Sequence, residues 1–279
     1  MSAETKDGFV DTNGIRTYYQ ETGEGPPIVF IHGIDLNLTY WQPEVEFFSR
    51  RYRAVAYDLR GMGKSGGANP EYEFDAYLAD LTALLAALGI DRPVLCGHSL
   101  GADIILQYGI SRPDGMRALV VADAPAPDNW VTSPLAYELQ KVAIDVLRVL
   151  HPLDPLSPLA PATQHLLYSR AFQEANPEAM AAFRQQYASN SVDGVLHAAK
   201  ALAFRKDNTE ELPQITAPTL LLRGSKDRIV SQGEMDTYHS QIAGSTLEIL
   251  DGSGHMTLQE QPEKFNGLME AFLTGLPPA

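Results

Sequence analysis

Hydrophobic residues along the chain form short runs that alternate with longer segments in which apolar positions recur every three to four residues. The short runs are bounded by glycine, proline and aspartate, a pattern typical of buried parallel strands. Two early runs, 8–12 and 15–20, flank Asn13-Gly14, a dipeptide typical of hairpin turns, so we expect an antiparallel pair there. The remaining strands are predicted at 27–31, 53–57, 93–97, 117–122, 218–223 and 246–250.

Helices are predicted in the gaps between these strands. The clearest covers residues 75–88, where apolar residues repeat with helical spacing up to Gly89, a residue type favoured just past a helix end. Strands that alternate with single helices are typical of βαβ units. The pattern therefore predicts an α/β fold in which a mostly parallel, eight-stranded sheet is flanked by helices.

One connection is much longer than the others. Between the strands at 117–122 and 218–223 lie about 95 residues, and prolines separate several helical patterns within them. We interpret this segment as a helical cap inserted over the sheet. The predicted division is a first core part at 1–124, a cap at 125–212 and a second core part at 213–279. The helical patterns lie near 135–150, 161–175, 177–190 and 191–206.

The composition is that of a globular chain: 279 residues, 44% of them hydrophobic and 20% charged. A net charge of −14 disfavours nucleic acid and anionic membrane surfaces as partners, because both are themselves negative. Residues 125–212 carry a net charge of −3, so most of the acidity, −11, lies outside the predicted cap.

Targeting signals and cysteine usage point to the cytoplasm. No apolar run approaches the roughly 20 residues that span a bilayer, and the first residues lack the basic and apolar regions of a signal peptide. The single cysteine, Cys96, cannot form an intramolecular disulfide. We expect a cytoplasmic protein, and the sequence indicates neither a metal nor another cofactor.

The sharpest chemical signal is Gly97-His98-Ser99-Leu100-Gly101, which follows a predicted strand and precedes a helical pattern. This is the GxSxG pattern of a nucleophile elbow, and it stands between a predicted strand and a predicted helix, as the elbow requires. The tight strand-to-helix turn exposes the serine hydroxyl. The start of the following helix presents free N–H groups, so the N–H of Leu100 is a candidate donor to an oxyanion. We therefore predict Ser99 to be a nucleophile.

A serine nucleophile needs a base and an acid that orients the base. Among seven histidines, His255 is the best candidate because it follows the last strand through a flexible loop. Asp227 follows the strand at 218–223 and is the preferred acid, with Asp123 as its rival. We expect His98 and His32 to be structural.

Four segments identify the chain as a member of the α/β-hydrolase superfamily, and the resemblance covers nearly all of it except the cap. They are the elbow at 97–101, Ile31-His32-Gly33, the segment Asp58 to Ser65, and Gly254-His255 with the following Glu260-Gln261-Pro262 and Phe265. The resemblance implies that the N–H of Ile34 is the second oxyanion donor. It also implies that the segment containing Asp58 and Arg60 is a structural turn.

The resemblance narrows the chemistry. Related dehalogenases and epoxide hydrolases carry aspartate at the elbow, and related haloperoxidases carry methionine where Leu100 stands. The reaction class that remains is ester or lactone hydrolysis of a small, largely apolar substrate. Residues 35–43 together with 57–61 are similar to the corresponding segments of enol-lactone hydrolases. A carbon–carbon bond hydrolase or lyase of the same fold, or a non-hydrolytic small-molecule receptor, stays open as an alternative.

Substrate contacts are expected from the cap. Its aromatic candidates for lining a pocket are Trp130, Tyr137, Phe172 and Tyr187. Asp35, two residues past the HG step, would oppose an oxyanion if it faced the pocket, so we expect it to turn outward or to cap the helix that begins near Thr39. A homodimer is compatible with the sequence.

Overall fold

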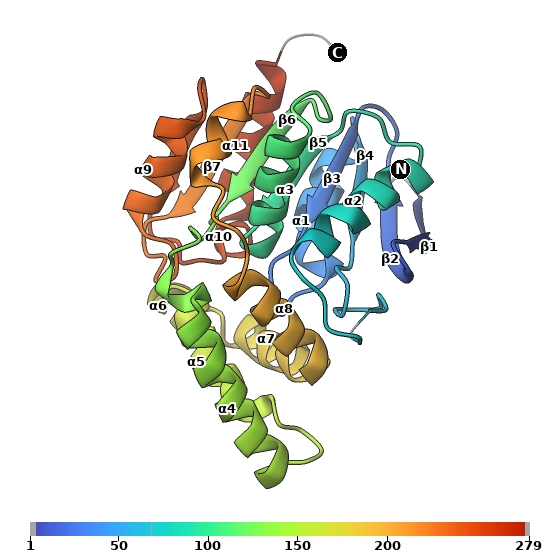
Figure 1. Cartoon of the computed structure of the whole chain (residues 1–279). Coiled ribbons are helices and arrows are strands. Elements are labelled where there is room, and N and C mark those ends of the chain that lie inside the picture. The colour runs from blue at the N-terminus through green and yellow to red at the C-terminus, as the bar shows by residue number, and fades with distance from the viewer. Residues whose placement is uncertain (1–3, 68, 277–279) are drawn as a thin grey trace.

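The computed structural model describes residues 4–67 and 69–276, and in this part of the chain eight strands form a single sheet (Figure 1). Their order across the sheet is β1-β2-β4-β3-β5-β6-β7-β8. Strand β2 runs antiparallel to its neighbours β1 and β4, and the other pairs are parallel. The strands are β1 (Thr5–Thr12), β2 (Ile15–Thr22), β3 (Pro27–Ile31), β4 (Arg53–Tyr57), β5 (Val94–His98), β6 (Ala118–Ala122), β7 (Thr219–Gly224) and β8 (Thr246–Leu250).

The predicted sheet is confirmed, and its six parallel-type runs fall within one residue of the observed strands. The opening hairpin turns at Asn13 and Gly14, which both have positive φ (39° and 81°), as the tight hairpin turns of this dipeptide require. The first strand starts at Thr5, earlier than predicted, because its polar, exposed residues carry no hydrophobic signal.

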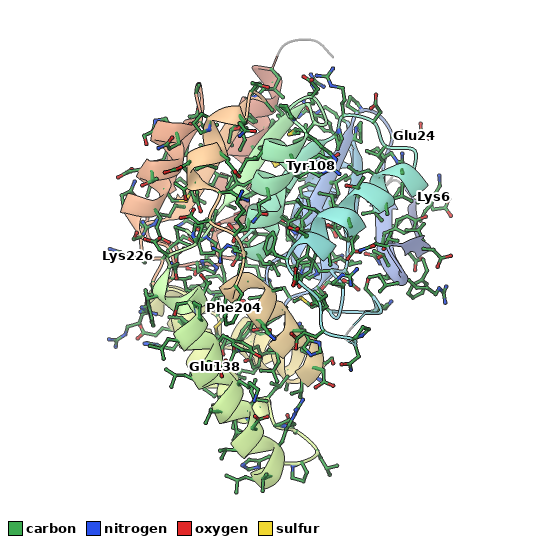
Figure 2. The ribbon with its side chains drawn as sticks, in the orientation of Figure 1. Lys6, Glu24, Tyr108, Glu138, Phe204 and Lys226 are labelled. Atoms are coloured by element: carbon green, nitrogen blue, oxygen red, sulfur yellow. The ribbon has the colours of Figure 1, made fainter. Side chains whose placement is uncertain are left out.

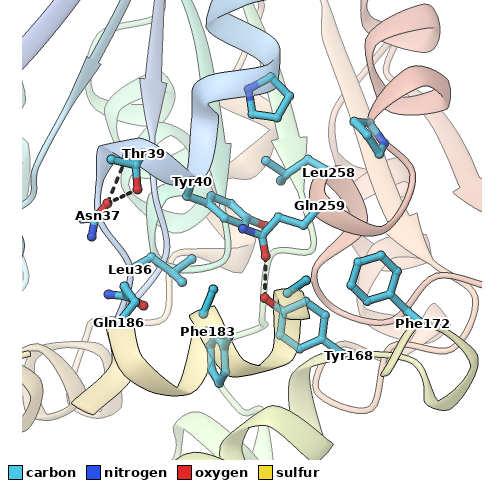
Figure 3. Close-up of a pocket in the computed structure, with 14 residues that line it drawn as sticks. Leu36, Asn37, Thr39, Tyr40, Tyr168, Phe172, Phe183, Gln186, Leu258 and Gln259 are labelled. Atoms are coloured by element: carbon cyan, nitrogen blue, oxygen red, sulfur yellow. Dashed lines mark hydrogen bonds between the residues drawn. The ribbon is translucent and has the colours of Figure 1, made fainter. Parts of the chain in front are cut away.

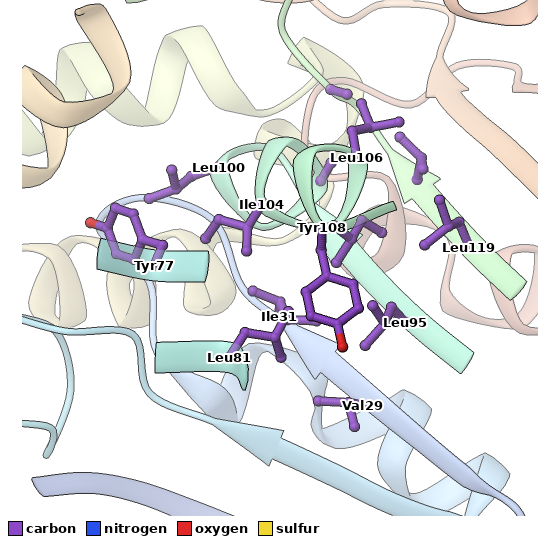
Figure 4. Close-up of a cluster of buried hydrophobic side chains, with 14 of the residues drawn as sticks. Val29, Ile31, Tyr77, Leu81, Leu95, Leu100, Ile104, Leu106, Tyr108 and Leu119 are labelled. Carbon is purple, nitrogen blue, oxygen red and sulfur yellow. The ribbon is translucent and has the colours of Figure 1, made fainter. Parts of the chain in front are cut away.

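Helices cover both faces of the sheet, since β3 alternates its side chains between two buried clusters. Val29 and Ile31 belong to a cluster with side chains of α2, α3 and α9, and Figure 4 shows its members from α2 and α3. Ile28 and Phe30 pack on the opposite face with side chains of α1 and α11. The helices outside the long insertion are α1 (Gln42–Phe48), α2 (Asp75–Ala87), α3 (Leu100–Ser111), α9 (Gln232–Gln241), α10 (Thr257–Glu260) and α11 (Pro262–Thr274), with the short 3-10 helix η1 (Leu38–Trp41) before α1. A second 3-10 helix, η4 (Thr209–Gln214), lies at the end of the insertion, before β7.

The predicted long insertion between β6 and β7 is helical. Its helices gather on one side of the sheet (Figure 1), and the N–H of His255 donates to the carbonyl of Leu167 within it at 2.8 Å. The division of the chain into a core and a cap at 125–212 stays a proposal. The elements of the insertion are η2 (Trp130–Thr132), α4 (Pro134–Leu150), η3 (Ser157–Leu159), α5 (Ala160–Leu167), α6 (Arg170–Ala175), α7 (Pro177–Ala188) and α8 (Val192–Ala203).

In residues 4–67 and 69–276, no helix combines the length and the apolar character that crossing a bilayer requires.

Candidate active site

Ser99 lies at the turn between β5 and α3 and holds a backbone conformation that side chains rarely adopt (φ 53°, ψ −116°). Two hydrogen bonds fix this turn: the N–H of Ser99 donates to Ala122 at 3.0 Å, and its carbonyl accepts from Asp103 at 3.1 Å. A Cβ atom at Gly97 would clash with the backbone of Gly101, so this approach of strand and helix requires glycine. The sequence motif therefore forms a strained elbow that the surrounding backbone maintains.

His255 and Asp227 form a hydrogen-bonded pair. The distance between His255 Nδ1 and Asp227 Oδ2 is 2.8 Å, and the second carboxylate oxygen accepts the N–H groups of Ile229 and Val230 at 2.7 and 3.0 Å. Burial alone would raise the pKa of Asp227, but the neighbouring imidazole and the two N–H donors outweigh it and hold the pKa below its ordinary value. An ionised Asp227 can orient the His255 ring and stabilise it when it is protonated.

His98 ties His255 to the elbow. The His98 ring lies 4.9 Å from the His255 ring, centroid to centroid, and its Nε2 is 2.8 Å from the carbonyl oxygen of His255. Since that carbonyl can only accept, Nε2 carries the proton, and burial lowers the pKa of His98 to about 3, which keeps the ring neutral. The residue next to Ser99 thus holds the backbone of His255 in place.

Asp123, the rival acid, lies beside the pair in a different role. Its two carboxylate oxygens accept from the N–H of Gly224 at 3.0 Å and from the hydroxyl of Thr257 at 2.6 Å. Burial and the negative charge of Asp227 raise the pKa of Asp123 well above its ordinary value. Asp123, Asp227 and His255 each offer one atom within 4.8 Å of the others, and hydrogen bonds already engage these groups. The carboxylate that hydrogen-bonds to His255 Nδ1 is that of Asp227.

The two expected oxyanion donors flank Ser99. Leu100 is the first residue of α3, so its N–H has no partner within that helix. On the other side, a Cβ atom at Gly33 would lie 3.1 Å from the Cβ of Ser99, which brings the following residue, Ile34, to the elbow. The backbone of this HG segment is fixed by His32, whose Nδ1 lies 2.7 Å from the Gly33 carbonyl oxygen and whose Nε2 accepts the N–H of Leu59 at 3.0 Å.

A cavity of about 290 Å³ is lined mainly by residues of the insertion and reaches residues next to this site. The residues adjoining the site that line it are Ile34, Leu167 and Ile229. Of the four aromatic candidates, Trp130, Tyr137 and Tyr187 line the cavity. Trp130 is 68% exposed, whereas Tyr137 and Tyr187 are buried.

Phe172 lies in a second, separate cavity of about 350 Å³ with Tyr168 and Phe183 (Figure 3). There the Tyr168 hydroxyl donates to the Gln259 side chain, as the dashed line shows. Phe172 stacks on Tyr168 with ring centroids 5.6 Å apart. Phe172 therefore lines a different cavity from the other three aromatic candidates.

Asp35 is buried, and the expectation that it turns outward or caps a helix is wrong. It is 7% exposed and lines the 290 Å³ cavity beside Ile34. The cap of η1 is Asn37, whose side chain accepts the N–H of Thr39 at 3.0 Å. Only one residue separates Asp35 from Asn37, and the sequence could not tell which of the two would cap the helix.

The backbone explains why Asp35 points inward. Its carbonyl oxygen accepts from the side chains of Gln186 and Asn190 at 3.0 and 2.8 Å, which fixes a turn with a φ of 63° at Asp35. Both donors come from the insertion, about 150 residues later in the chain. The sequence around Asp35 therefore could not predict these hydrogen bonds. Burial raises the pKa of Asp35 to about 7.

A buried ion pair in the helix that follows the elbow was also not predicted from the sequence. The Arg205 side chain, 1% exposed, places its Nε 3.0 Å from a carboxylate oxygen of Asp103 in the first turn of α3. Arg205 also donates to the carbonyls of Leu202 and Pro125 at 2.6 and 2.9 Å. It therefore links the end of the insertion to the helix that carries the elbow.

In the segment from Asp58 to Ser65, the side chains of Asp58 and Arg60 bind other parts of the core. The Asp58 carboxylate accepts the N–H groups of Leu38 and Lys64, both at 2.7 Å. Arg60 forms a two-pronged ion pair with Asp80, with both N–O distances at 2.6 Å.

Comparisons with known proteins agree with this fold. A family model described as the alpha/beta hydrolase fold matches residues 26–262. Over 248 residues the chain is 27% identical to 3-oxoadipate enol-lactonase 2 of Acinetobacter baylyi, covering 89% of this chain and 88% of that protein. It is also 28% identical over 267 residues to a putative non-heme chloroperoxidase of Synechocystis, covering 93% and 95%. Among solved structures, a thermophilic esterase from Thermogutta terrifontis is similar with a TM-score of 0.87 and 27% identity, covering 96% of this chain and 98% of that chain.

Proposed function

Because the chain belongs to the alpha/beta hydrolase fold family, we propose that it is a serine hydrolase that cleaves a carboxylic ester or lactone through an acyl-enzyme intermediate. The observation that carries the proposal is the strained elbow at Ser99 beside a His255–Asp227 pair bonded at 2.8 Å. The resemblance to an enol-lactonase and to an esterase supports this reaction class.

Each residue of the site has one role in the proposed reaction. Ser99 Oγ attacks the acyl carbon while His255 accepts its proton, and Asp227 holds the imidazole in the tautomer that can do so. The N–H groups of Ile34 and Leu100 stabilise the oxyanion. The protonated His255 then gives its proton to the leaving alkoxide, and a water molecule repeats the cycle on the acyl-enzyme.

The cavity supports a small substrate. Its volume of about 290 Å³ is at the lower end for small-molecule sites, and most of its lining is apolar. Trp130 and Tyr137 are the proposed substrate contacts, at the mouth and in the wall. We place this activity in the cytoplasm, where the buried, free Cys96 would remain reduced.

A panel of p-nitrophenyl esters and lactones tests the proposal. We expect butyrate to be hydrolysed with a kcat/KM at least tenfold above that of dodecanoate, because a cavity of about 290 Å³ cannot enclose the longer chain. Five- and six-membered lactones should compete with the ester at the same site. The measurement is initial rates over a range of substrate concentrations at pH 8.

Three results, on this panel or in companion assays of ligand binding and of diketone cleavage, would contradict the proposal. Saturable ligand binding with no turnover would indicate a receptor. Turnover of a vinylogous diketone in place of every ester would indicate a carbon–carbon bond hydrolase. Equal rates on butyrate and dodecanoate would show that the 290 Å³ cavity does not hold the acyl chain.

A further inference from the structure

Asp35 places a carboxyl group in the wall of the cavity beside the proposed oxyanion donor. Its Oδ1 atom is buried and accepts no hydrogen bond from the residues that the structure describes. Thr132, in the same wall, has a buried hydroxyl that is likewise unpaired within the described chain. Buried polar atoms in folded proteins are nearly always hydrogen-bonded, so two unpaired ones in one cavity indicate a ligand that pairs with them.

We propose that Asp35 binds a hydrogen-bond donor of the substrate, a hydroxyl or an ammonium group carried close to the scissile carbonyl. The inference rests on the proposed function and names its substrate class. Asp35 directly follows Ile34, so their Cα atoms are only about 3.8 Å apart. A substrate whose carbonyl oxygen meets the Ile34 N–H therefore presents its neighbouring carbons to the Asp35 side chain.

The surroundings of Asp35 favour a donor from the substrate over one from the protein. Tyr187 lines the same cavity, but its hydroxyl is engaged with Thr163. Gln186 and Asn190 bond the carbonyl oxygen of Asp35, not its carboxyl group. Burial raises the pKa of this carboxyl to about 7, and an incoming donor relieves the cost of ionising it.

Matched esters test this inference. The p-nitrophenyl esters of 3-hydroxybutyrate, 3-aminobutyrate and 3-methylbutyrate differ only in one group of nearly equal size. We expect the wild type to prefer the hydroxy or the amino ester over the methyl ester by at least tenfold in kcat/KM. Asp35→Gly, which suits the positive φ, should lose this preference. Asp35→Asn, which also tolerates that φ, should keep a preference for the hydroxyl and lose one for the ammonium group.

The outcomes separate this inference from the proposed function. The same ranking of the three esters in the wild type and in Asp35→Gly would overturn the role of Asp35, even with full esterase activity. If the wild type hydrolyses none of them, the proposed function fails, and calorimetry with the amides of the same three acids then tests Asp35 directly. Equal affinity for the three amides would overturn the inference; tighter binding of the hydroxy or amino amide that Asp35→Gly abolishes would support it.

A different observation concerns helix α4. Five large apolar side chains on it, here called the α4 seam, are between 51% and 80% exposed: Leu135, Leu139, Val142, Val146 and Val149. Their spacing of four, three, four and three residues is the heptad spacing of a helix that pairs with another helix. The opposite face is already used, since Tyr137 and Ile144 are buried and α4 packs against α8. Such a contiguous exposed stripe is unusual for a monomer.

We infer that a second copy of this chain covers the α4 seam, with the two α4 helices antiparallel across a twofold axis that passes through the seam midway between Val142 and Val146. In that arrangement Leu139 lies opposite Val149 of the second copy, and Val142 lies opposite Val146. The same face is therefore complementary to itself, as a twofold interface requires.

Charge favours a second copy over an oppositely charged partner. Along the seam the basic residues are already paired: Lys141 with Asp145 at 2.9 Å, and Arg148 with both Asp145 and Asp193. Figure 2 shows Glu138 on the same helix, well away from the sheet. Because residues 125–212 carry only −3 of the total −14, contact through the tips of the insertions keeps the acidic cores apart.

Sedimentation equilibrium of the full chain between 1 and 100 µM tests the interface. We expect a dimer with a Kd below about 10 µM, and a Kd at least 100-fold higher for Val142→Glu/Val146→Glu. Phe9→Glu is the matched control, since Phe9 is an exposed apolar residue on β1 and should leave the Kd unchanged. A short bismaleimide should crosslink a mixture of Leu139→Cys and Val149→Cys, and neither variant alone, because the native Cys96 is buried.

Three results would overturn the interface. They are a monomeric wild type at 100 µM, a dimer that the paired glutamates leave intact, and a monomer whose seam instead binds phosphatidylcholine vesicles. A crosslink between two copies of the Leu139→Cys variant would show that the two α4 helices pair in parallel and would overturn the antiparallel arrangement.

Discussion

Replacement of Ser99 by alanine is expected to lower kcat for p-nitrophenyl butyrate by on the order of 10⁶-fold, as the loss of a nucleophile does in other hydrolytic triads. The oxyanion donors and His255 remain in place, but no atom can form the acyl-enzyme. The fold should persist, because the backbone bonds of Ser99 to Ala122 and Asp103 do not involve its hydroxyl. Steady-state rates and the circular dichroism spectrum measure the two effects.

Ser111, at the other end of the same helix, is the matched control. Its hydroxyl donates to the carbonyl of Tyr108 at 3.1 Å, at the opposite end of α3 from Ser99. Ser111→Ala should therefore keep wild-type kcat and KM. Undiminished turnover in folded Ser99→Ala protein would reject Ser99 as the nucleophile and, with it, the covalent mechanism.

The parts of the fold that the sequence predicted are those with local causes. A parallel strand buried on both faces appears as an uninterrupted apolar run, as in residues 118–122, and its position follows from those few residues. The elbow was predictable for the same reason, since Gly97, Ser99 and Gly101 are required within one turn. The resemblance to α/β hydrolases, confirmed by the match over residues 26–262, supplied what the local pattern could not.

The features that escaped prediction depend on partners far away in the chain. Asp35 is turned inward by Gln186 and Asn190, and Asp103 is paired with Arg205, 102 residues later. Before the insertion is folded, an aspartate near a helix start resembles any capping residue. Sequence patterns predict which apolar faces are buried, but they do not predict which buried polar groups form hydrogen bonds or ion pairs with each other.

Arg205→Leu is expected to lower the free energy of unfolding by about 3–5 kcal/mol at pH 8, from two causes. It leaves Asp103 buried without its counter-charge. The change also leaves the carbonyls of Leu202 and Pro125 without a donor. Thermal unfolding should register a Tm lower by roughly 10 °C. Since Arg205 fastens the insertion to α3, the variant should also lose esterase activity at temperatures below its Tm.

The pH dependence of the free energy of unfolding shows whether the buried charge of Asp103 causes the loss of stability. Burial raises the pKa of Asp103 to about 7 even though the charge of Arg205 opposes this, so without Arg205 the pKa must rise further. Below pH 7 Asp103 is protonated in both proteins, so the difference in stability does not change with pH and comes from the two carbonyls left without a donor. Above pH 7 the wild type ionises Asp103 beside Arg205, whereas the variant must keep the proton. The difference should grow by about 1.4 kcal/mol per pH unit.

Two further variants test whether the buried charge is responsible. Asp103→Asn/Arg205→Leu removes both charges and should recover the pH-dependent part of the lost stability, about 1.4 kcal/mol at pH 8, with no growth of the remaining deficit at higher pH. Arg170→Leu removes an arginine that is 83% exposed in its ion pair with Glu174, and should leave the Tm unchanged. A deficit in Arg205→Leu that is equal at pH 6 and pH 9 would assign the loss to packing and the two carbonyls, because a neutral cause has no proton to exchange.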